Sequence, residues 1–468
     1  MQGRKQSNKF EQHQHIKAVS PERWDPPPPP PFITSSQTRP SYCSDKMSHF
    51  PPELIHHVVD FLADDRQTLY NSALTSSSFL HPSRRHIFRQ ILLRSSSGQC
   101  RPARRFLDFL STAPHLATYI TSLRVMIGQY RASISEDWIG GWIHEDDALP
   151  VVFSLLTRLQ ELSIESTNSP LKWQNVPLDL QNAVVEVIGG TTLSRLSLIQ
   201  VVDFPILPLR ISSSLKNIVL HCVTLTDSKI ESSLLYPSAG AFSPLEGLHI
   251  VEARDTNFSD IHSWIHNGES TSLHLSCLKR LSLTIYGRWM SYSDDMAVVS
   301  KLLDVCSPTL EQLKLTPPLT FACLSDLANH PFHLATMPKL RKLEFGLEIS
   351  DFEDMETSLS LSWLTELFSN LPTCNVIEDI VLKCEILQAN PLGEFDHGIW
   401  TKIDKALTCK ELSSLRHVTL ILYPVHSEAK KHATIATELL QQEMKILCRR
   451  NILQIEKRYD SNRFKILE

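Results

Sequence analysis

A triplet of apolar residues recurs along most of the 468-residue chain, its second member three positions and its third member five positions after the first. The nine instances are Leu159-Leu162-Ile164, Leu193-Leu196-Leu198, Leu215-Ile218-Leu220, Leu245-Leu248-Ile250, Leu278-Leu281-Leu283, Leu310-Leu313-Leu315, Leu340-Leu343-Phe345, Ile377-Ile380-Leu382 and Leu415-Val418-Leu420. The last two members are two apart, as a strand with one buried face requires, and the first closes the preceding turn against the core. Between the triplets lie segments of helical spacing, such as Val299-Leu302-Leu303-Cys306 and Trp363-Leu364-Leu367-Phe368. The pattern predicts an α/β protein with a parallel sheet lined by helices.

The triplet is similar to the strand of a leucine-rich repeat, which implies an irregular solenoid of parallel strands with outer helices. The middle positions are 22 to 38 residues apart, whereas the repeats of that family usually span ~20 to 29 residues. A compact α/β domain with a doubly wound sheet is the competing fold. In a leucine-rich repeat, the residues that alternate with the buried leucines face the concave surface and can contact a protein target. The resulting candidates for target binding are Glu161, Glu165, Arg195, His221, His249, Arg280, Lys314, Lys342, Glu344 and Lys383, with Ser163 and His417 at equivalent positions.

Residues 50–93 follow a different, helical pattern. After Pro51-Pro52-Glu53, the apolar residues Leu54, Ile55, Val58, Val59 and Leu62 form one stripe. Proline at a helix start forfeits no intrahelical hydrogen bond, and an acidic residue in the first turn suits the helix dipole. Two further helical stretches follow, one around Leu69 and Leu74 and one around Ile87. Three short helices bury little surface alone, so a partner or a neighbouring domain is expected to stabilise them.

This segment resembles an F-box of the fungal type. The residues that carry the resemblance are Phe50-Pro51-Pro52-Glu53-Leu54-Ile55, Val58-Val59-Asp60-Phe61-Leu62, Asp64-Asp65, Thr68-Leu69, Ala73-Leu74 and Ser83-Arg84-Arg85-His86-Ile87-Phe88. The resemblance implies contact with the Skp adaptor of a cullin-RING ubiquitin ligase through Pro51, Leu54, Ile55, Val58, Val59 and Leu62. The family commonly has Val-Cys-Arg and then a tryptophan where this chain has Thr75-Ser76-Ser77 and Phe79. A plain helical cap on the repeat array is the alternative interpretation.

The chain is therefore divided into five predicted segments. Residues 1–46 are a disordered tail whose proline run, Pro26 to Pro31, is interpreted as a linker in preference to an SH3 or WW ligand. Residues 47–95 are the F-box, and residues 96–155 are a linker with the first irregular α/β repeats. Residues 156–425 are the leucine-rich-repeat-like array, and residues 426–468 are a C-terminal cap.

Composition and motifs exclude several classes of function. A net charge of -5 gives no general attraction to nucleic acid or to an anionic membrane. The arginine-dense stretch from Arg84 to Arg105 is interpreted as a solvated surface, in preference to a phosphate-binding site or a nuclear import signal. No CxxC, GxGxxG, GxxxxGK[ST] or GxSxG motif occurs, so no cofactor and no catalytic residue is predicted. His262 and His266 have helical spacing but lack a third metal ligand. The pair Asp146-Asp147 is interpreted as solvated charge in a turn. The chain is expected to be cytoplasmic or nuclear.

The resemblance implies a non-enzymatic substrate-recognition subunit of a Skp/cullin/F-box ubiquitin ligase. Its F-box would bind the adaptor and, through it, the cullin, and its repeats would bind a protein target. Two alternatives stay open. One is a leucine-rich repeat scaffold with a vestigial F-box, and the other is a hydrolase or transferase on a degenerate α/β fold.

Overall fold

The computed structural model describes residues 51–95, 101–128, 141–167, 169–226, 244–251, 275–284, 292–316, 334–349, 356–369, 371–372, 375–386, 397–424 and 429–458. The described residues from Pro52 onward belong to one compact unit. The proline run and the His262/His266 pair lie outside the described residues.

A large parallel sheet dominates the described residues. Its twelve strands are β1 (Gln90–Arg94), β2 (Ser122–Ile127), β3 (Glu161–Ser166), β5 (Arg195–Ile199), β8 (Asn217–His221), β10 (Gly247–Val251), β11 (Arg280–Thr284), β12 (Gln312–Thr316), β13 (Lys342–Ile349), β14 (Asp379–Ile386), β15 (His417–Pro424) and β16 (Leu453–Lys457). Every neighbouring pair is parallel, and the strands lie side by side in the order in which the chain makes them. A doubly wound sheet reverses its strand order at a switch point, and this sheet does not. The predicted α/β class with a parallel sheet is confirmed.

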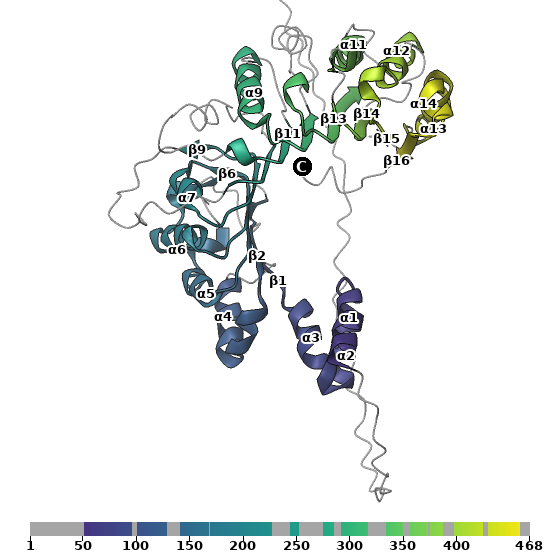
Figure 1. The fold of residues 1–468 in the computed structure, drawn as a ribbon. Helices are drawn as coiled ribbons and strands as arrows, with labels where there is room; N and C mark the ends of the chain where they lie inside the picture. Colours follow the sequence, from purple (N-terminus) through teal and green to yellow (C-terminus); the bar gives the residue numbers. More distant parts are fainter. Residues whose placement is uncertain are drawn as a thin grey trace, which may run out of the picture. The chain divides into compact units, whose positions relative to one another are not determined.

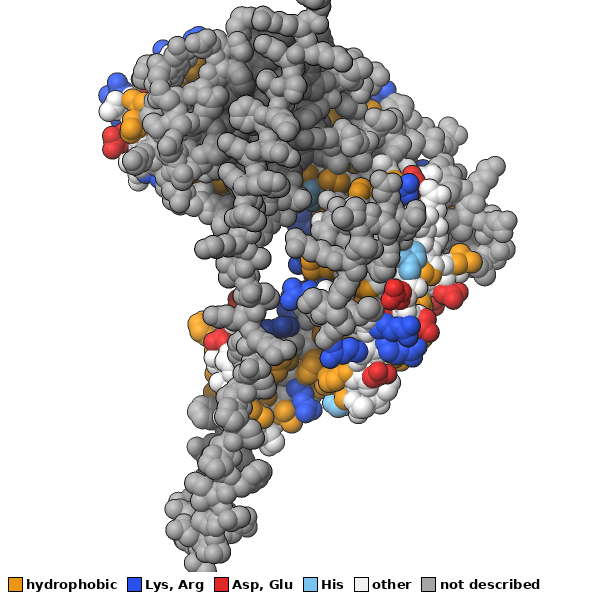
Figure 2. Space-filling model, turned by 180° about the vertical axis from the view of Figure 1, so that it is seen from behind, with side chains coloured by type: hydrophobic (Ala, Val, Ile, Leu, Met, Phe, Trp, Pro, Cys, Tyr) orange, Lys and Arg blue, Asp and Glu red, His pale blue; other side chains and the backbone are white. Residues whose placement is uncertain are grey.

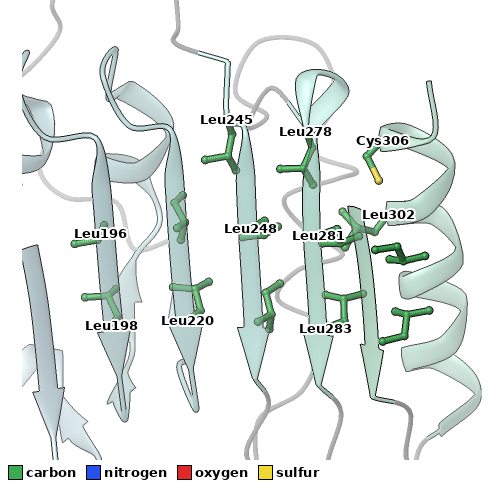
Figure 3. Close-up of a cluster of buried hydrophobic side chains, with 14 of the residues drawn as sticks. Leu196, Leu198, Leu220, Leu245, Leu248, Leu278, Leu281, Leu283, Leu302 and Cys306 are labelled. Atoms are coloured by element: carbon green, nitrogen blue, oxygen red, sulfur yellow. The ribbon is translucent and has the colours of Figure 1, made fainter. Parts of the chain in front are cut away.

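The apolar triplets build the core of this sheet. Every member of the nine triplets is buried, and the last two members of each lie on a strand. Parallel pairing places Leu196, Ile218 and Leu248 in one row across β5, β8 and β10. Figure 3 shows the leucines at matching positions of successive strands, with Leu302 and Cys306 of a helix beside the strand that carries Leu281 and Leu283. Burial of this continuous apolar layer is the main contribution to the stability of the fold, because each leucine packs against those of the neighbouring strands and is removed from water.

Helices cover one side of the sheet (Figure 1). They are α4 (Pro102–Thr112), α5 (Leu149–Leu155), α6 (Leu178–Gly189), α7 (Leu207–Ile211), α9 (Tyr292–Cys306), α11 (Glu356–Ser369), α12 (His397–Leu407), α13 (Ala429–Glu443) and α14 (Lys445–Arg449). Short 3-10 turns occur at η1 (Pro114–Tyr119), η2 (Gly141–His144), η3 (Trp173–Asn175), η4 (Leu275–Cys277), η5 (Leu334–Thr336) and η6 (Lys410–Leu412). Two small parallel pairs lie outside the large sheet: β4 (Leu171–Lys172) with β6 (Val201–Val202), and β7 (Phe204–Pro205) with β9 (Leu225–Thr226). The predicted helical segments before β12 and β14 are α9 and α11.

The sheet starts earlier in the chain than the nine triplets indicate. β1 lies within the segment predicted as the F-box, and β2 lies within residues 96–155, which are predicted as a linker with the first irregular α/β repeats. The same spacing is present there, as Phe88-Ile91-Leu93 and Ile120-Leu123-Val125. The sequence around these two triplets does not by itself identify them as strands. The pairing of β1 with β2 and of β2 with β3 does.

Three helices precede the sheet: α1 (Pro52–Phe61), α2 (Arg66–Thr75) and α3 (Ser77–Ile87). They pack around a small core of their own, formed by Ile55, Val59, Leu69 and Ile87. Asp65 caps α2 by accepting a hydrogen bond from the backbone N–H of Thr68 at 3.0 Å. The connection from α3 to β1 is short, and the Arg66 guanidinium donates to the carbonyl oxygens of Ile87 and Gln90 at 3.4 and 3.3 Å across it.

Two buried carboxylates tie helix starts to distant parts of the chain. Asp146 accepts hydrogen bonds from the backbone N–H groups of Ala103 and Arg104, at 2.7 and 3.2 Å, at the start of α4. Asp404 does the same for Ile446 and Leu447, at 2.9 and 3.0 Å, at the start of α14. The prediction that Asp146 is a solvated turn residue is wrong, because these otherwise unpaired helix N–H groups bind it inside the protein. Its neighbour Asp147 is exposed, as predicted.

Candidate protein-recognition surfaces

The three-helix module leaves large apolar side chains exposed. On α1, the exposed residues Leu54, Val58 and Phe61 are four and three positions apart and therefore share one face of the helix. Tyr70 and Leu74 of α2 are exposed as well, and the side chains of Phe61 and Leu74 are the most open of the set. We call these five residues the module face. Single exposed leucines are ordinary on a protein surface, whereas these five large apolar side chains lie within twenty-one residues of one another in the chain.

The residues predicted for adaptor binding divide into two groups on α1. Ile55 and Val59 are buried against α2 and α3, and Leu62 packs partly against the same core. Leu54 and Val58 belong to the module face, and Pro51 is exposed just before the helix. Helical periodicity of 3.6 residues per turn rotates the two groups by roughly 100° relative to each other. In this structure Pro51, Leu54 and Val58 of the predicted set are exposed, Leu62 is partly exposed, and Ile55 and Val59 are buried. Phe61, Tyr70 and Leu74 are exposed apolar residues outside the predicted set.

The second surface is the sheet face that points away from the apolar triplets. All ten residues predicted for target binding alternate with the buried strand positions and lie on this face. The strand register places them in rows, so that Glu161 neighbours Arg195 and Lys314 neighbours Glu344. The face is partly self-neutralised by ion pairs between neighbouring strands, and Figure 2 shows basic and acidic side chains next to one another on one side of the molecule.

The strongest of these pairs joins β2 to β3. Arg124 donates two hydrogen bonds to the carboxylate of Glu165, both at 2.6 Å, and the Ser163 hydroxyl donates a third at 2.7 Å. Hydrogen bonding to Glu165 raises the pKa of the Arg124 guanidinium. Glu165 is buried and Arg124 is half exposed, so most of this carboxylate is committed to its own chain and is a poor candidate for binding a target. Arg124 was not among the predicted residues, although it follows Leu123 in the unrecognised triplet of β2.

A depression of about 320 Å³ lies further along the same face. Residues in register from β5 to β13 line it: Arg195, Asn217, Gly247, Arg280, Gln312 and Lys342. The guanidinium of Arg280 reaches across β10 and donates to the side-chain oxygen of Asn217 at 2.8 Å. Three of these residues, Arg195, Arg280 and Lys342, are predicted singly from the sequence, and the register of six strands brings all six residues together.

Charged and polar groups of the next row, among them His249, Lys314 and Glu344, line the depression as well. Glu344 lies between two lysines, 3.3 Å from Lys314 and 2.7 Å from Lys383. Burial alone would raise the pKa of Glu344, but its hydrogen bonds and charge interactions with the two lysines outweigh burial and lower the pKa. Burial, aided by the positive charge of Lys314, lowers the pKa of His249 to about 4. His249 is therefore neutral at physiological pH and adds no positive charge.

The shifted His249 predicts how stability depends on pH. Its pKa is about 4 in the folded chain and near 6.5 when unfolded, so between these values only the unfolded state binds the proton and acid favours unfolding. We expect wild-type stability to fall from pH 6.5 toward pH 4 more steeply than that of His249→Asn. Urea denaturation of both chains at several pH values measures the difference. Parallel pH profiles would contradict the assignment.

Other site chemistry is sparse in the described part of the chain. Its residues contain no cluster of three or more His, Cys, Asp or Glu arranged to hold a metal ion. Burial raises the pKa of the Cys306 and Cys384 thiols to about 12, so both are protonated at neutral pH. Every helix described is too short or too polar to cross a lipid bilayer.

Comparison with known proteins adds no relative to this description. No protein-family model matches the chain, and no curated protein is significantly similar to it. A function for the chain is therefore inferred from the fold and from its two surfaces, the module face and the outward face of the sheet.

Proposed function

We propose that the chain is the substrate-recognition subunit of a Skp/cullin/F-box type ubiquitin ligase. Its helical module would be the F-box that binds the Skp adaptor, and its sheet would be an irregular leucine-rich repeat array that binds a protein target. The observation that carries the proposal is the module face, because it leaves Leu54, Val58 and Phe61 unpartnered within the segment that resembles an F-box.

The packing of the module supports this role. A fold whose own core consists of Ile55, Val59, Leu69 and Ile87 buries little surface, so covering a further apolar face would contribute stability as well as affinity. Full burial of an exposed large apolar side chain contributes roughly 1.5–3 kcal/mol. Phe61 and Leu74 are almost fully exposed and Leu54, Val58 and Tyr70 are half exposed, so covering the module face would favour binding of a partner. Aromatic residues such as Phe61 and Tyr70 are enriched at the cores of protein interfaces.

The mechanism we propose is positional. The adaptor would hold the chain on the cullin, the sheet face would hold the target, and a conjugating enzyme elsewhere in the complex would transfer ubiquitin to a lysine of the target. Acceleration would come from a raised local concentration of the target at the enzyme. No side chain of this chain is assigned a catalytic role.

Binding to a purified fungal Skp adaptor tests the proposal. The variant is Leu54→Asp with Val58→Asp, which places two charges in the module face and leaves the inner core of α1 intact. We expect its affinity for the adaptor to fall at least about a hundredfold, because burying an unpaired carboxylate is costly. The thermal unfolding midpoint should stay close to that of the wild type, since both side chains are exposed.

The matched control is Leu178→Asp with Val151→Asp, which makes the same exchanges at an exposed leucine of α6 and an exposed valine of α5. This control should bind the adaptor like the wild type. Failure of the wild type to bind, or equal binding by the module-face variant, would overturn the F-box assignment.

A repeat scaffold with a vestigial F-box is the second candidate. It is favoured by the polar junction of α2 and α3, where Thr75, Ser76 and Ser77 are exposed in place of the residues common in the family. Ser76 accepts a hydrogen bond from the backbone N–H of Ser78 at 3.3 Å and serves to start α3. Adaptor binding without any cullin-dependent change in the abundance of bound partners would identify the scaffold.

A further inference from the structure

We propose that the depression around Gly247 binds an oxyanion, a carboxylate or phosphoryl group, on an acidic peptide segment of the target protein. The inference rests on the proposed function, because it names the chemistry of a target for the sheet face. Its basis is a row of side-chain hydrogen-bond donors, interrupted only by Gly247, that crosses the strands from β5 to β13 and contains no carboxylate.

The row runs from β5 to β13. Its side chains are those of Arg195, Asn217, Arg280, Gln312 and Lys342, with Gly247 in the middle. The nearest acidic residues of the same row are Glu161 on β3 and Asp379 on β14, just beyond its two ends. Because neighbouring strands are ~4.8 Å apart, Arg280 and Lys342 are roughly 10 Å apart along the row, a span that extended peptide side chains can bridge.

The positive charges of the depression exceed the negative ones. Arg280 is hydrogen-bonded to a neutral amide, and Lys342 makes no ion pair with any residue that the structure describes. Arg195 is paired with Glu161 at 2.9 Å. In the next row the single carboxylate of Glu344 forms ion pairs with both Lys314 and Lys383. An incoming oxyanion would therefore meet unneutralised donors, and such charge-assisted hydrogen bonds are stronger than neutral ones.

Gly247 gives the depression its shape. A Cβ atom at this position would lie 2.5 Å from the side-chain oxygen of Asn217 and 3.5 Å from Nε of Arg280. The absence of a side chain leaves room for Arg280 to lie across β10 and reach Asn217. Gly247→Ala displaces only the ends of flexible side chains, so it changes the geometry of the site while keeping every charge.

A peptide library bound to the full-length chain tests the proposal. The library has degenerate flanks and one fixed central residue: glutamate, phosphoserine, serine or lysine. We expect the wild type to retain glutamate or phosphoserine peptides about tenfold better than serine or lysine peptides. The double variant Arg280→Gln with Lys342→Gln should lose this preference, and Gly247→Ala should weaken it.

The charge-matched control is Arg449→Gln with Lys402→Gln, which removes one arginine and one lysine from the exposed surfaces of α14 and α12. This control should keep the preference for acidic peptides. An equal loss in the control and in the Arg280/Lys342 variant would show a mere net-charge effect and overturn the site. An unchanged preference in the Arg280/Lys342 variant would overturn it as well.

The same measurements distinguish the source of the oxyanion. A preference for phosphoserine over glutamate assigns a phosphoryl group, and equal retention assigns a carboxylate; both support the site. Binding of single-stranded oligouridine in place of acidic peptides, with the same dependence on Arg280 and Lys342, would overturn the peptide assignment.

Failure of this inference is separable from failure of the proposed function. The Arg280/Lys342 variant leaves the module face unchanged and should bind the Skp adaptor like the wild type. The Leu54/Val58 variant should in turn keep the wild-type preference for acidic peptides. Loss of both activities in either variant would indicate misfolding, which circular dichroism and the unfolding midpoint detect.

Discussion

Phe345→Ala is expected to lower the free energy of unfolding by about 3–5 kcal/mol, the largest effect of any single exchange considered for this chain. Phe345 is fully buried on β13 and packs edge-to-face against Trp363 and Phe368 of α11, with ring centroids 5.6 and 6.2 Å apart. The exchange removes both aromatic contacts and leaves a cavity between sheet and helix. Equilibrium urea denaturation measures the loss, and hydrogen exchange should show it first in β13 and α11, because a stacked array unfolds locally.

The matched control for this prediction is Phe61→Ala. Phe61 is 91% exposed on α1, so the same chemical change there should alter the free energy of unfolding by no more than about 0.5 kcal/mol. Because Phe61 belongs to the module face, its exchange is expected to reduce adaptor binding without reducing stability. Equal destabilisation by the two exchanges would contradict the packing described for β13 and α11.

Arg124→Ala is expected to lower the free energy of unfolding by about 2–3 kcal/mol, somewhat less than the loss of one partner from a fully buried pair. The side chain of Glu165 is 9% exposed and that of Arg124 is 53% exposed. Removing the guanidinium leaves the Glu165 carboxylate with the Ser163 hydroxyl as its remaining partner in this cluster. Adding Glu165→Gln to the Arg124→Ala chain should recover part of the loss, because the uncompensated charge is then gone. Urea denaturation of the single and double variants measures both changes.

Arg195→Ala is the control for Arg124→Ala. The two arginines are equally exposed, at 54% and 53%, but the partner of Arg195, Glu161, is 33% exposed where Glu165 is 9% exposed. A solvated carboxylate can rebind water, so this exchange should cost no more than about 1 kcal/mol. Equal losses of unfolding free energy in the two variants would show that burial of the carboxylate does not determine the contribution of the Arg124–Glu165 pair to stability.

Much of the fold could be predicted because its signal is local. The spacing of Leu340, Leu343 and Phe345 depends only on the alternation of a strand and on one turn before it, and the same rule placed eight other strands. The helical stripes before β12 and β14 are equally local. β1 and β2 carry the same spacing, yet nothing within a short window separates Ile120-Leu123-Val125 from a buried helical segment.

The two surfaces were predictable only in part. Alternation along a strand places Arg280 and Lys342 on the outward face, but whether they lie near each other depends on which strands pair and in which register. Helical periodicity likewise groups Leu54, Ile55, Val58 and Val59 on one side of α1. It does not say which half of that side α2 and α3 cover.

The sequence by itself determined the α/β class, the parallel strands and the alternation of buried and outward residues along them, because these follow from contacts between near neighbours in the chain. Tertiary structure decided the rest through contacts between distant residues. It buried Asp146 against helix N–H groups 43 and 42 positions away, and it joined Arg124 to Glu165 across 41 positions. It also placed Gly247 between Asn217 and Arg280, so that a missing side chain became a depression lined by positive charge. Burial, pairing and shape of this kind depend on strand order and register, which no local pattern encodes.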